Sequence, residues 1–272
     1  MKLSLKKIKQ LFSATTVKKN VVNQFDNNLL KEINFRNFKD PLVSIIIPFY
    51  NQEAITLSCL HSLAKNLCDK YSYEIILIDD NSNEADRINE IKNIYLIRNK
   101  ENQGFLKNIN LGINKSIGEY VYILNNDTVV KENFLTELIY VFENFDNVGA
   151  VGSKLINKDG TLQEAGAFFL KNKKIRQVVK NKTIQSPEIN YIYETDYCSG
   201  ASLLFKKNND KGELNLLDEN YLPAYFEETD LCFRLKYIQN KKIYYTPFSE
   251  VIHLDGISYK KSNKSKKQEL LK

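Results

Sequence analysis

Three apolar runs of this chain end abruptly in side chains suited to binding a nucleotide and a metal ion. The runs, each with the residues that follow it, are 44–47 with Pro48, Phe49, Tyr50 and Asn51; 75–78 with Asp79, Asp80, Asn81 and Ser82; and 120–124 with Asn125, Asn126 and Asp127. Continuous apolar runs are typical of strands buried in a parallel sheet, and open α/β sheets bind ligands at the carboxyl ends of such strands. The pattern therefore predicts one polar site at a sheet edge, and an enzyme.

The carboxylate of Asp80 can accept hydrogen bonds from a nucleobase N–H or from ribose hydroxyls. Tyr50 and Asn51 end the preceding run, where an aromatic ring can stack on the base. A second polar segment runs from Asn102 to Gly104, and the glycine permits close backbone approach to a ligand. The alternatives are an Asp/Asn turn that caps the next helix and a glycine turn before an amphipathic helix.

Asp127 can supply one carboxylate ligand to Mg²⁺ or Mn²⁺, because such hard ions are usually shared between one or two carboxylates, substrate phosphates and water. The alternative for Asp127 is a helix N-cap. His253 follows the apolar pair 251–252 and is a candidate ligand of the metal or of a diphosphate. The alternative for His253 is a structural histidine.

The segment 226–234 collects three carboxylates, Glu227, Glu228 and Asp230. Neighbouring like charges raise the pKa of a carboxyl group, which suits a general base. The alternative is an acidic helix N-terminus that complements the helix dipole.

Strand and helix patterns alternate from about residue 42 to 153, which predicts β-α-β units and an α/β fold with a mostly parallel central sheet. The predicted strands are 43–47, 74–78, 94–97, 120–124 and 148–152, and the predicted helices are 54–66, 84–91, 105–117 and 132–145. The pattern then predicts loops and an irregular insertion over 154–196, followed by ordered structure at 197–205, 228–238 and 243–245.

The composition is that of a globular protein, with 43% hydrophobic and 26% charged residues in a chain of 272. No apolar segment approaches the roughly 20 residues that span a bilayer, and no signal peptide is recognisable. The four cysteines are scattered. These features predict a cytoplasmic location.

The net charge of +6 comes from the two ends of the chain. Because the middle is not basic, we expect no nucleic-acid partner. The basic segment 1–40 carries an amphipathic pattern that predicts either a helix on the inner face of an anionic membrane or a solvated arm. The lysine-rich segment 259–272 is a second extension, and its abrupt end is compatible with one piece of a longer polypeptide.

Taken together, the motifs resemble those of glycosyltransferase family 2, a large family of inverting enzymes with the GT-A fold. Seven segments match in the family's order, namely Val43 to Asn51, Ile78 to Ser82, Asn102 to Phe105, Leu124 to Thr128, Ser199 to Ala201, Phe226 to Asp230, and Val251 to His253. The resemblance implies a GT-A Rossmann-like domain over 41–258.

By this resemblance, Asp80 would hold the nucleotide base. The residues for which nucleotide binding is implied are Pro48, Tyr50, Asn51, Asp80, Asn102, Gly104 and Asn126. Asp127 looks like the last carboxylate of the family's D-x-D metal motif. The first position of that motif is Asn125 here, so a single carboxylate ligand is implied, with His253 as a further candidate.

Glu228 falls where many members of the family carry the aspartate that serves as base. The assignment among Glu227, Glu228 and Asp230 stays open. Gly200 and Ala201 match a segment that approaches the donor sugar or the acceptor.

The resemblance implies inverting, metal-dependent transfer of a sugar from a UDP- or dTDP-sugar to a hydroxyl of a saccharide or lipid-linked acceptor, in bacterial surface polysaccharide biosynthesis. One alternative is a sugar-nucleotide nucleotidyltransferase, which would need a glycine-rich, basic phosphate loop after the first strand. Another is a catalytically silent carbohydrate-binding module.

Overall fold

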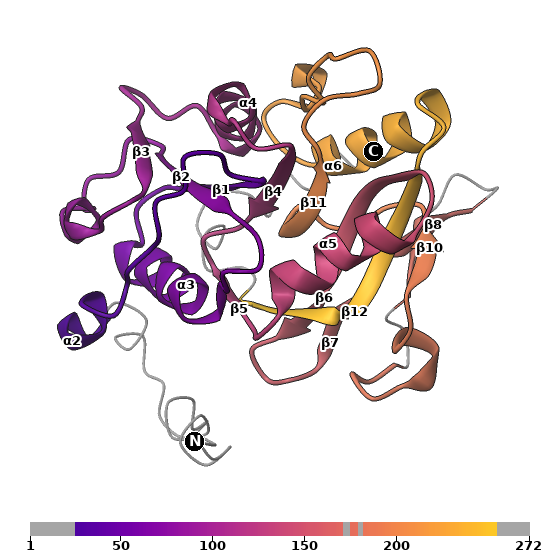
Figure 1. Ribbon diagram of the computed structural model, residues 1–272, viewed down its shortest axis with the longest axis horizontal. Helices are drawn as coiled ribbons and strands as arrows, with labels where there is room; N and C mark the ends of the chain where they lie inside the picture. The colour runs from indigo at the N-terminus through magenta and orange to yellow at the C-terminus, as the bar shows by residue number, and fades with distance from the viewer. Residues whose placement is uncertain (1–24, 171–174, 179–181, 255–272) are drawn as a thin grey trace.

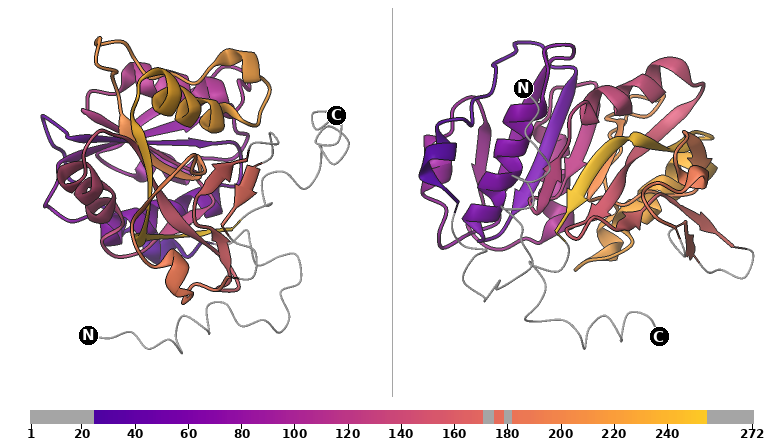
Figure 2. Two further views of the ribbon diagram at one scale, coloured as in Figure 1. Left: turned by 90° about the vertical axis from the view of Figure 1, so that its right-hand side faces the viewer. Right: turned by 90° about the horizontal axis from the view of Figure 1, so that it is seen from below.

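A curved sheet with helices on both faces forms the framework of the computed structural model, which describes residues 25–170, 175–178 and 182–254 (Figures 1 and 2). The strands are β1 (Val43–Phe49), β2 (Tyr73–Asp79), β3 (Tyr95–Arg98), β4 (Tyr120–Leu124), β5 (Thr128–Val130), β6 (Val148–Asn157), β7 (Leu162–Glu164), β8 (Ala167–Phe169), β9 (Ile175–Gln177), β10 (Tyr193–Thr195), β11 (Ser202–Lys206) and β12 (Lys242–His253). The helices are α2 (Asn27–Leu30), α3 (Glu53–Asn66), α4 (Phe105–Lys115), α5 (Phe134–Asn144) and α6 (Glu227–Phe233), with short turns η1 (Arg87–Glu90), η2 (Pro187–Ile189), η3 (Glu219–Tyr221) and η4 (Arg234–Ile238).

The first half of the sheet is parallel, in the order β3-β2-β1-β4. Every residue of β1 is buried, as expected for a strand covered by helices on both faces. The helices α3 and α4 of this half begin within one residue of their predicted starts. The predicted helix 84–91 is wrong, because only half of it is helical, as the single turn η1. The parallel strands β1, β2 and β4 therefore have their carboxyl ends at one edge of the sheet.

The second half of the sheet is mixed, in the order β4-β11-β6-β12-β10. β11 is antiparallel to both β4 and β6, whereas β12 is parallel to β6. The α/β fold class is confirmed, with the parallel arrangement confined to the first half and to the pair β6–β12. Residues 154–196 contain β7 to β10 within their described part, where the sequence predicts irregular structure.

β12 is far longer than the predicted strand at 243–245. The sequence pattern breaks at Pro247, which lacks an N–H for sheet hydrogen bonding. The structure accommodates this residue in an irregularity of register between Thr246 and Glu250, and the strand then continues to His253.

Two sets of buried side chains fill the space between sheet and helices. On one face lie α3 and α5, which bury Leu57, Leu60 and Leu63 and Phe134, Leu138 and Val141. On the other face lie α4 and α6, which bury Leu106, Ile109 and Ile113 and Leu231 and Cys232. The spacing of three and four residues produces the apolar stripe of a helix packed on a sheet.

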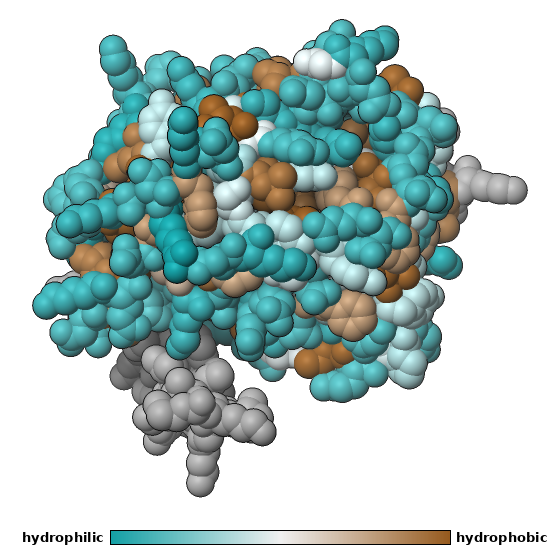
Figure 3. Space-filling view, in the orientation of Figure 1, coloured by the Kyte–Doolittle hydropathy of each residue, from teal (hydrophilic) through white to brown (hydrophobic). Residues whose placement is uncertain are grey.

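Residues 25–40, the described part of the predicted basic extension, pack against the sheet, since Ile33 and Phe35 belong to its core. Residues 1–24 and the predicted tail 259–272 lie outside the described residues. Within the described ranges, none of the helices has the length and apolar character needed to cross a bilayer. The face shown in Figure 3 is mostly hydrophilic, with hydrophobic residues visible between the polar ones.

Candidate active site

Asp127 and His253 are brought together by a short strand pairing. β5 begins directly after Asp127 and pairs antiparallel with the end of β12, so that Thr128 lies opposite His253. The backbone N–H of Leu254 donates to the carbonyl of Asp127 at 2.9 Å. As a result, Nε2 of His253 lies 3.2 Å from Oδ1 of Asp127, and both side chains are largely buried.

The ring of His253 is held on both of its nitrogens. Nδ1 lies 3.0 Å from Oε1 of Gln163, and Nε2 lies 3.3 Å from Nδ2 of Asn125. In this arrangement Nδ1 donates its proton to Gln163, and the lone pair of Nε2 faces Asn125 and Asp127. A metal-ligating histidine is oriented in the same way, through a hydrogen bond from its other ring nitrogen.

The pair fits a divalent cation. Two ligand atoms at roughly 2.0–2.1 Å from one octahedral ion lie about 3 Å apart, close to the 3.2 Å between Oδ1 of Asp127 and Nε2 of His253. A carboxylate oxygen facing an imidazole lone pair is also repulsive unless a cation or a proton lies between them. The described residues contain no cluster of three or more His, Cys, Asp and Glu side chains able to hold a metal. Asp127 and His253 would therefore supply only part of the coordination of such an ion.

Asp80 organises the loop between β3 and α4. Its carboxylate accepts hydrogen bonds from the backbone N–H groups of Gln103 at 2.7 Å and Gly104 at 3.0 Å, and from Nδ2 of Asn99 at 2.9 Å. Asn102 donates to the carbonyl oxygen of Asp80 at 3.3 Å. Gly104 has φ of +80°, a conformation that favours glycine. Both oxygens of the buried Asp80 carboxylate therefore serve the loop.

The ends of β1 and β2 are tied together by Asn51. Its backbone N–H donates to the Ser82 hydroxyl at 2.7 Å, and its Oδ1 accepts from the N–H of Asn83 at 2.9 Å. Tyr50 is 49% exposed at this edge, and Pro48 is buried within β1. The exposed ring of Tyr50 is available to stack on a ligand.

Asn126 is largely buried and donates from Nδ2 to the Thr56 hydroxyl of α3 at 3.0 Å. This contact fixes the turn before Asp127 against the helix.

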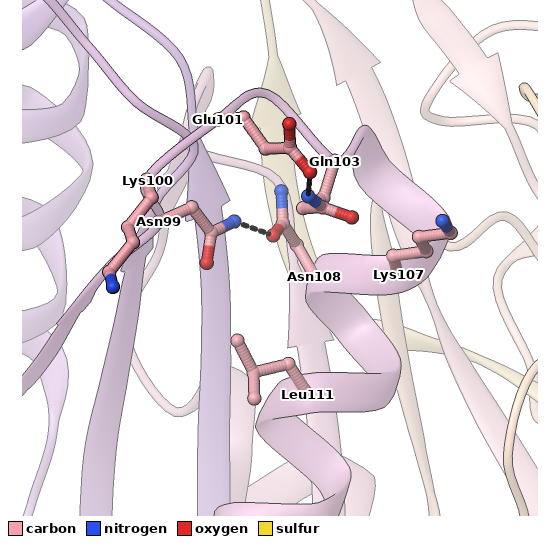
Figure 4. A pocket seen from close by; sticks show the side chains of 7 residues that line it. All are labelled: Asn99, Lys100, Glu101, Gln103, Lys107, Asn108 and Leu111. Carbon is pink, nitrogen blue, oxygen red and sulfur yellow. Dashed lines mark hydrogen bonds between the residues drawn. The ribbon is translucent and has the colours of Figure 1, made fainter.

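A hollow of about 560 Å³ adjoins the loop that Asp80 holds. Figure 4 shows its lining, with Asn99 donating to Oδ1 of Asn108 at 2.6 Å and Leu111 further along α4. Asn99 and Gln103 both contact Asp80 and line the hollow. The hollow is therefore contiguous with the predicted nucleotide-binding residues.

The acidic cluster starts α6 after two residues with left-handed backbone. Tyr225 has φ of +82° and Phe226 has φ of +72°, which is uncommon for aromatic residues and typical of functional sites. Glu227 is 5% exposed, and its Oε2 is a buried oxygen without a hydrogen-bond partner among the described residues. Burial raises the pKa of Glu227 above its usual value.

Glu228 keeps part of its surface exposed. The burial of its carboxyl group, together with the charges of Glu227 and Glu164, raises its pKa to about 8. Asp230 is paired instead with Arg234, whose Nε lies 2.6 Å from Oδ2, and it also accepts from the Tyr221 hydroxyl at 3.4 Å. The three carboxylates that the sequence left undecided therefore have different surroundings.

Glu164 is a buried carboxylate that sequence reasoning missed. Its Oε1 accepts from the backbone N–H of Ser199 at 2.7 Å, and burial raises its pKa to about 7. The one available signal was a Gln-Glu pair between Leu162 and Ala165 in a short apolar run. Residues 154–196 showed no periodicity that would have placed this pair on a strand.

The segment 199–201 connects the two groups of site residues. A β-carbon at Gly200 would lie 3.3 Å from Cβ of Glu228, so this glycine packs against the glutamate. The carbonyl of Ala201 accepts from the N–H of Asn125 at 3.1 Å. Glu228 and the Asp127 turn therefore lie at the same edge of the sheet.

On the other side, Gly104 faces the carbonyl oxygen of Pro223, which would lie 3.8 Å from a β-carbon at that glycine. The loop held by Asp80 thus meets the loop that leads into Glu227. The residues predicted from three strand ends and from α6 surround one edge of the molecule.

Comparisons with known proteins agree with this arrangement. Residues 44–208 match the sequence profile of Glycosyl transferase family 2. An uncharacterized glycosyltransferase of Haemophilus influenzae is 31% identical over 121 residues, covering 42% of this chain and 37% of that protein. Glycosyltransferase GlyG of Streptococcus pneumoniae is 29% identical over 120 residues, covering 41% of this chain and 38% of that protein.

Among solved structures, a crystal structure of GalNAc-T7 with UDP, GalNAc and Mn²⁺ matches with a TM-score of 0.61 at 17% identity, covering 80% of this chain and 44% of that chain. The chain thus spans less than half the length of each of these relatives. The structural match shows the GT-A fold, and the profile match shows that the chain belongs to glycosyl transferase family 2.

Proposed function

We propose that this glycosyltransferase moves a sugar from a nucleoside diphosphate sugar to a hydroxyl of a saccharide or lipid-linked acceptor, with inversion and with a divalent cation. The observation that carries the proposal is the position of Glu228, a partly exposed carboxylate that packs against Gly200 at the edge where Asp127 and His253 meet. Inversion by a single displacement needs a base beside the donor, and Glu228 supplies it there.

Among the three candidate carboxylates, Glu228 is best suited to be the base. Asp230 is engaged by Arg234, whose Nε lies 2.6 Å from its Oδ2, so that this carboxylate is occupied by an ion pair and does not face an acceptor hydroxyl. Glu227 is too buried to meet an acceptor hydroxyl, since only 5% of its surface is exposed. The pKa of Glu228, raised to about 8, is near neutral pH and therefore favours proton transfer from a hydroxyl.

Asp127 and His253 are the residues that would hold the cation, as Oδ1 and Nε2 are spaced for one ion. A bound Mn²⁺ or Mg²⁺ supplies positive charge that stabilises the nucleoside diphosphate leaving group. The GalNAc-T7 structure, of the same fold, was solved with UDP, GalNAc and Mn²⁺.

We propose that the donor is a UDP- or dTDP-sugar whose nucleobase lies at the carboxyl ends of β1 and β2. Tyr50 offers an exposed ring for stacking, and Asp80 keeps the loop 102–104 in place around that position. We place the acceptor in the assembly of a bacterial surface polysaccharide, in line with the bacterial glycosyltransferases that the chain resembles.

A donor screen tests the proposed function. The protein is incubated with UDP-, dTDP- and GDP-sugars and Mn²⁺, and release of the nucleoside diphosphate is followed with and without candidate acceptors. We expect release from one nucleotide class, lost on chelation of the metal. A protein that releases no nucleoside diphosphate from any of the donors while still binding saccharides would point to a binding module instead.

A further inference from the structure

The strand β7 carries an irregularity beside the site. Leu155 of β6 pairs with Glu164, and the next residue, Ile156, pairs with Leu162, so that Gln163 is an extra residue on β7. A bulge of this kind re-aims a side chain, and bulges are frequent next to active sites. Neighbouring side chains of a regular strand point to opposite faces. Here, with the bulge, the side chains of Gln163 and Glu164 both contact residues of the site, namely His253 and Ser199.

Gln163 contacts the cation-binding end of the site. Its Oε1 lies 3.0 Å from Nδ1 of His253, while Nδ2 of Asn125 lies 3.3 Å from Nε2. The carbonyl oxygen of Gln163 requires a proton on Nδ1, and the amide of Asn125 requires a lone pair on Nε2. The two amides together select the tautomer whose Nε2 faces Asp127.

Glu164 contacts the end of the site where Glu228, the proposed catalytic base, lies. Its Oε1 accepts from the N–H of Ser199 at 2.7 Å, and the next residue, Gly200, packs against Glu228. Glu164 is only 5% exposed. A buried carboxylate kept at a backbone N–H fixes the 199–201 segment more rigidly than a solvated one could.

We propose that the bulged pair Gln163–Glu164 is the positioning element of the site. Gln163 orients His253 toward the cation, and Glu164 holds the 199–201 segment against Glu228. Both halves of this inference rest on the proposed function, because the first concerns the affinity for the cation and the diphosphate and the second concerns turnover at Glu228. Neither residue is placed in contact with the substrate.

The Gln163 half is tested by calorimetry with UDP and dTDP, each with and without Mn²⁺. Gln163→Leu should reduce the gain in nucleotide affinity that Mn²⁺ provides by about 10- to 100-fold, the usual effect of removing a partner of a metal ligand. Gln163→Glu keeps an oxygen acceptor for Nδ1 and should retain that gain. The matched control is Gln185→Leu, the same change at an exposed residue.

An unchanged gain in Gln163→Leu would overturn the positioning role. If the unsubstituted protein shows no Mn²⁺-dependent affinity for either nucleotide, the proposed function fails, and this half of the inference fails with it. The two failures are distinguishable because the second is visible before any substitution is made.

The Glu164 half is tested by kinetics. Glu164→Ala should lower kcat at least tenfold while leaving nucleotide affinity in the presence of Mn²⁺ unchanged, because the segment beside Glu228 loses its anchor. Glu164→Gln keeps an oxygen for the Ser199 N–H and should recover most of kcat. The control is Glu90→Ala, at an exposed glutamate of η1. Equal losses in the Ala and Gln variants, or no loss in either, would overturn the role of Glu164.

Discussion

Nε2 of His253 lies 3.2 Å from Oδ1 of Asp127, although these residues are far apart in the sequence. The contact arises because β5, only three residues long, pairs with the last residues of β12. A carboxylate oxygen and an imidazole nitrogen, two atom types that bind divalent cations, therefore lie side by side at this edge of the sheet. Removal of either partner therefore has a defined expected effect.

His253→Ala should abolish most of the Mn²⁺-dependent affinity for UDP, since one of the two proposed protein ligands is lost. Calorimetry with and without Mn²⁺ measures the effect, and we expect a loss of at least tenfold. His61→Ala is the matched control, because His61 is the other histidine of the chain. It lies on α3, and its Nε2 is 3.1 Å from Oε2 of Glu32. Equal losses in the two variants would argue against a role for His253 in holding the cation.

Glu228→Gln should lower kcat by at least 100-fold while preserving UDP affinity, because the amide cannot accept the proton of the acceptor hydroxyl. The measurement is the initial rate of nucleoside diphosphate release at saturating donor and acceptor. Glu90→Gln, at an exposed position, is the control. Full turnover by Glu228→Gln would exclude Glu228 as the base.

The pH dependence of kcat/KM should rise with an apparent pKa near 8, because the base must be deprotonated and the pKa of Glu228 is raised to about 8. Burial and the charge of Glu227 cause this shift. Glu227→Gln removes the neighbouring charge and should move the rise to lower pH. An apparent pKa of kcat/KM that is unchanged or higher in Glu227→Gln would contradict the influence of the Glu227 charge on Glu228.

The same shift affects stability. The pKa of Glu228 rises from 4.5 to about 8 on folding, so the folded state binds more protons than the unfolded state between these pH values. The contribution of Glu228 to stability is therefore present below pH about 4.5 and is lost as the pH rises to about 8. Denaturant unfolding should show less decline between pH 5 and 8 for Glu228→Gln than for the unsubstituted protein, and an identical decline would be inconsistent with the raised pKa.

Asp80→Ala should destabilise the fold as well as weaken nucleotide binding. The N–H groups of Gln103 and Gly104 would lose their acceptor, and a buried donor without a partner costs about 1–3 kcal/mol. Urea unfolding measures the loss, and Asp86→Ala, at an exposed aspartate, is the control. A variant with unchanged stability would show that solvent replaces the carboxylate at no cost.

The parallel half of the sheet could be predicted from the sequence because β1, β2 and β4 are continuous apolar runs, which are typical of strands buried on both faces of a sheet. Val43 to Phe49 and Tyr73 to Asp79 are both strands, and each is followed directly by polar residues of the predicted site. Asp80, Asp127 and Glu228 could be recognised from the sequence alone, because each carboxylate either follows an apolar run or lies among other carboxylates.

The contacts among these residues could not be predicted, because they depend on long-range pairings of very short strands. β5 and β7 have three residues each, too few for a periodic pattern. The bulge that aims Gln163 and Glu164 at one edge has no sequence signature of its own. Pro247 concealed the length of β12, which delivers His253 to the site.

The most direct test of the proposed site is a crystal structure of the protein with UDP and Mn²⁺. We expect the ion between Oδ1 of Asp127 and Nε2 of His253, and the uracil ring of UDP beside Tyr50. We expect the carboxylate of Glu228 on the side of the diphosphate where the sugar attaches. An ion bound elsewhere, or a nucleotide bound away from the edge that Asp80 and Asp127 share, would contradict it.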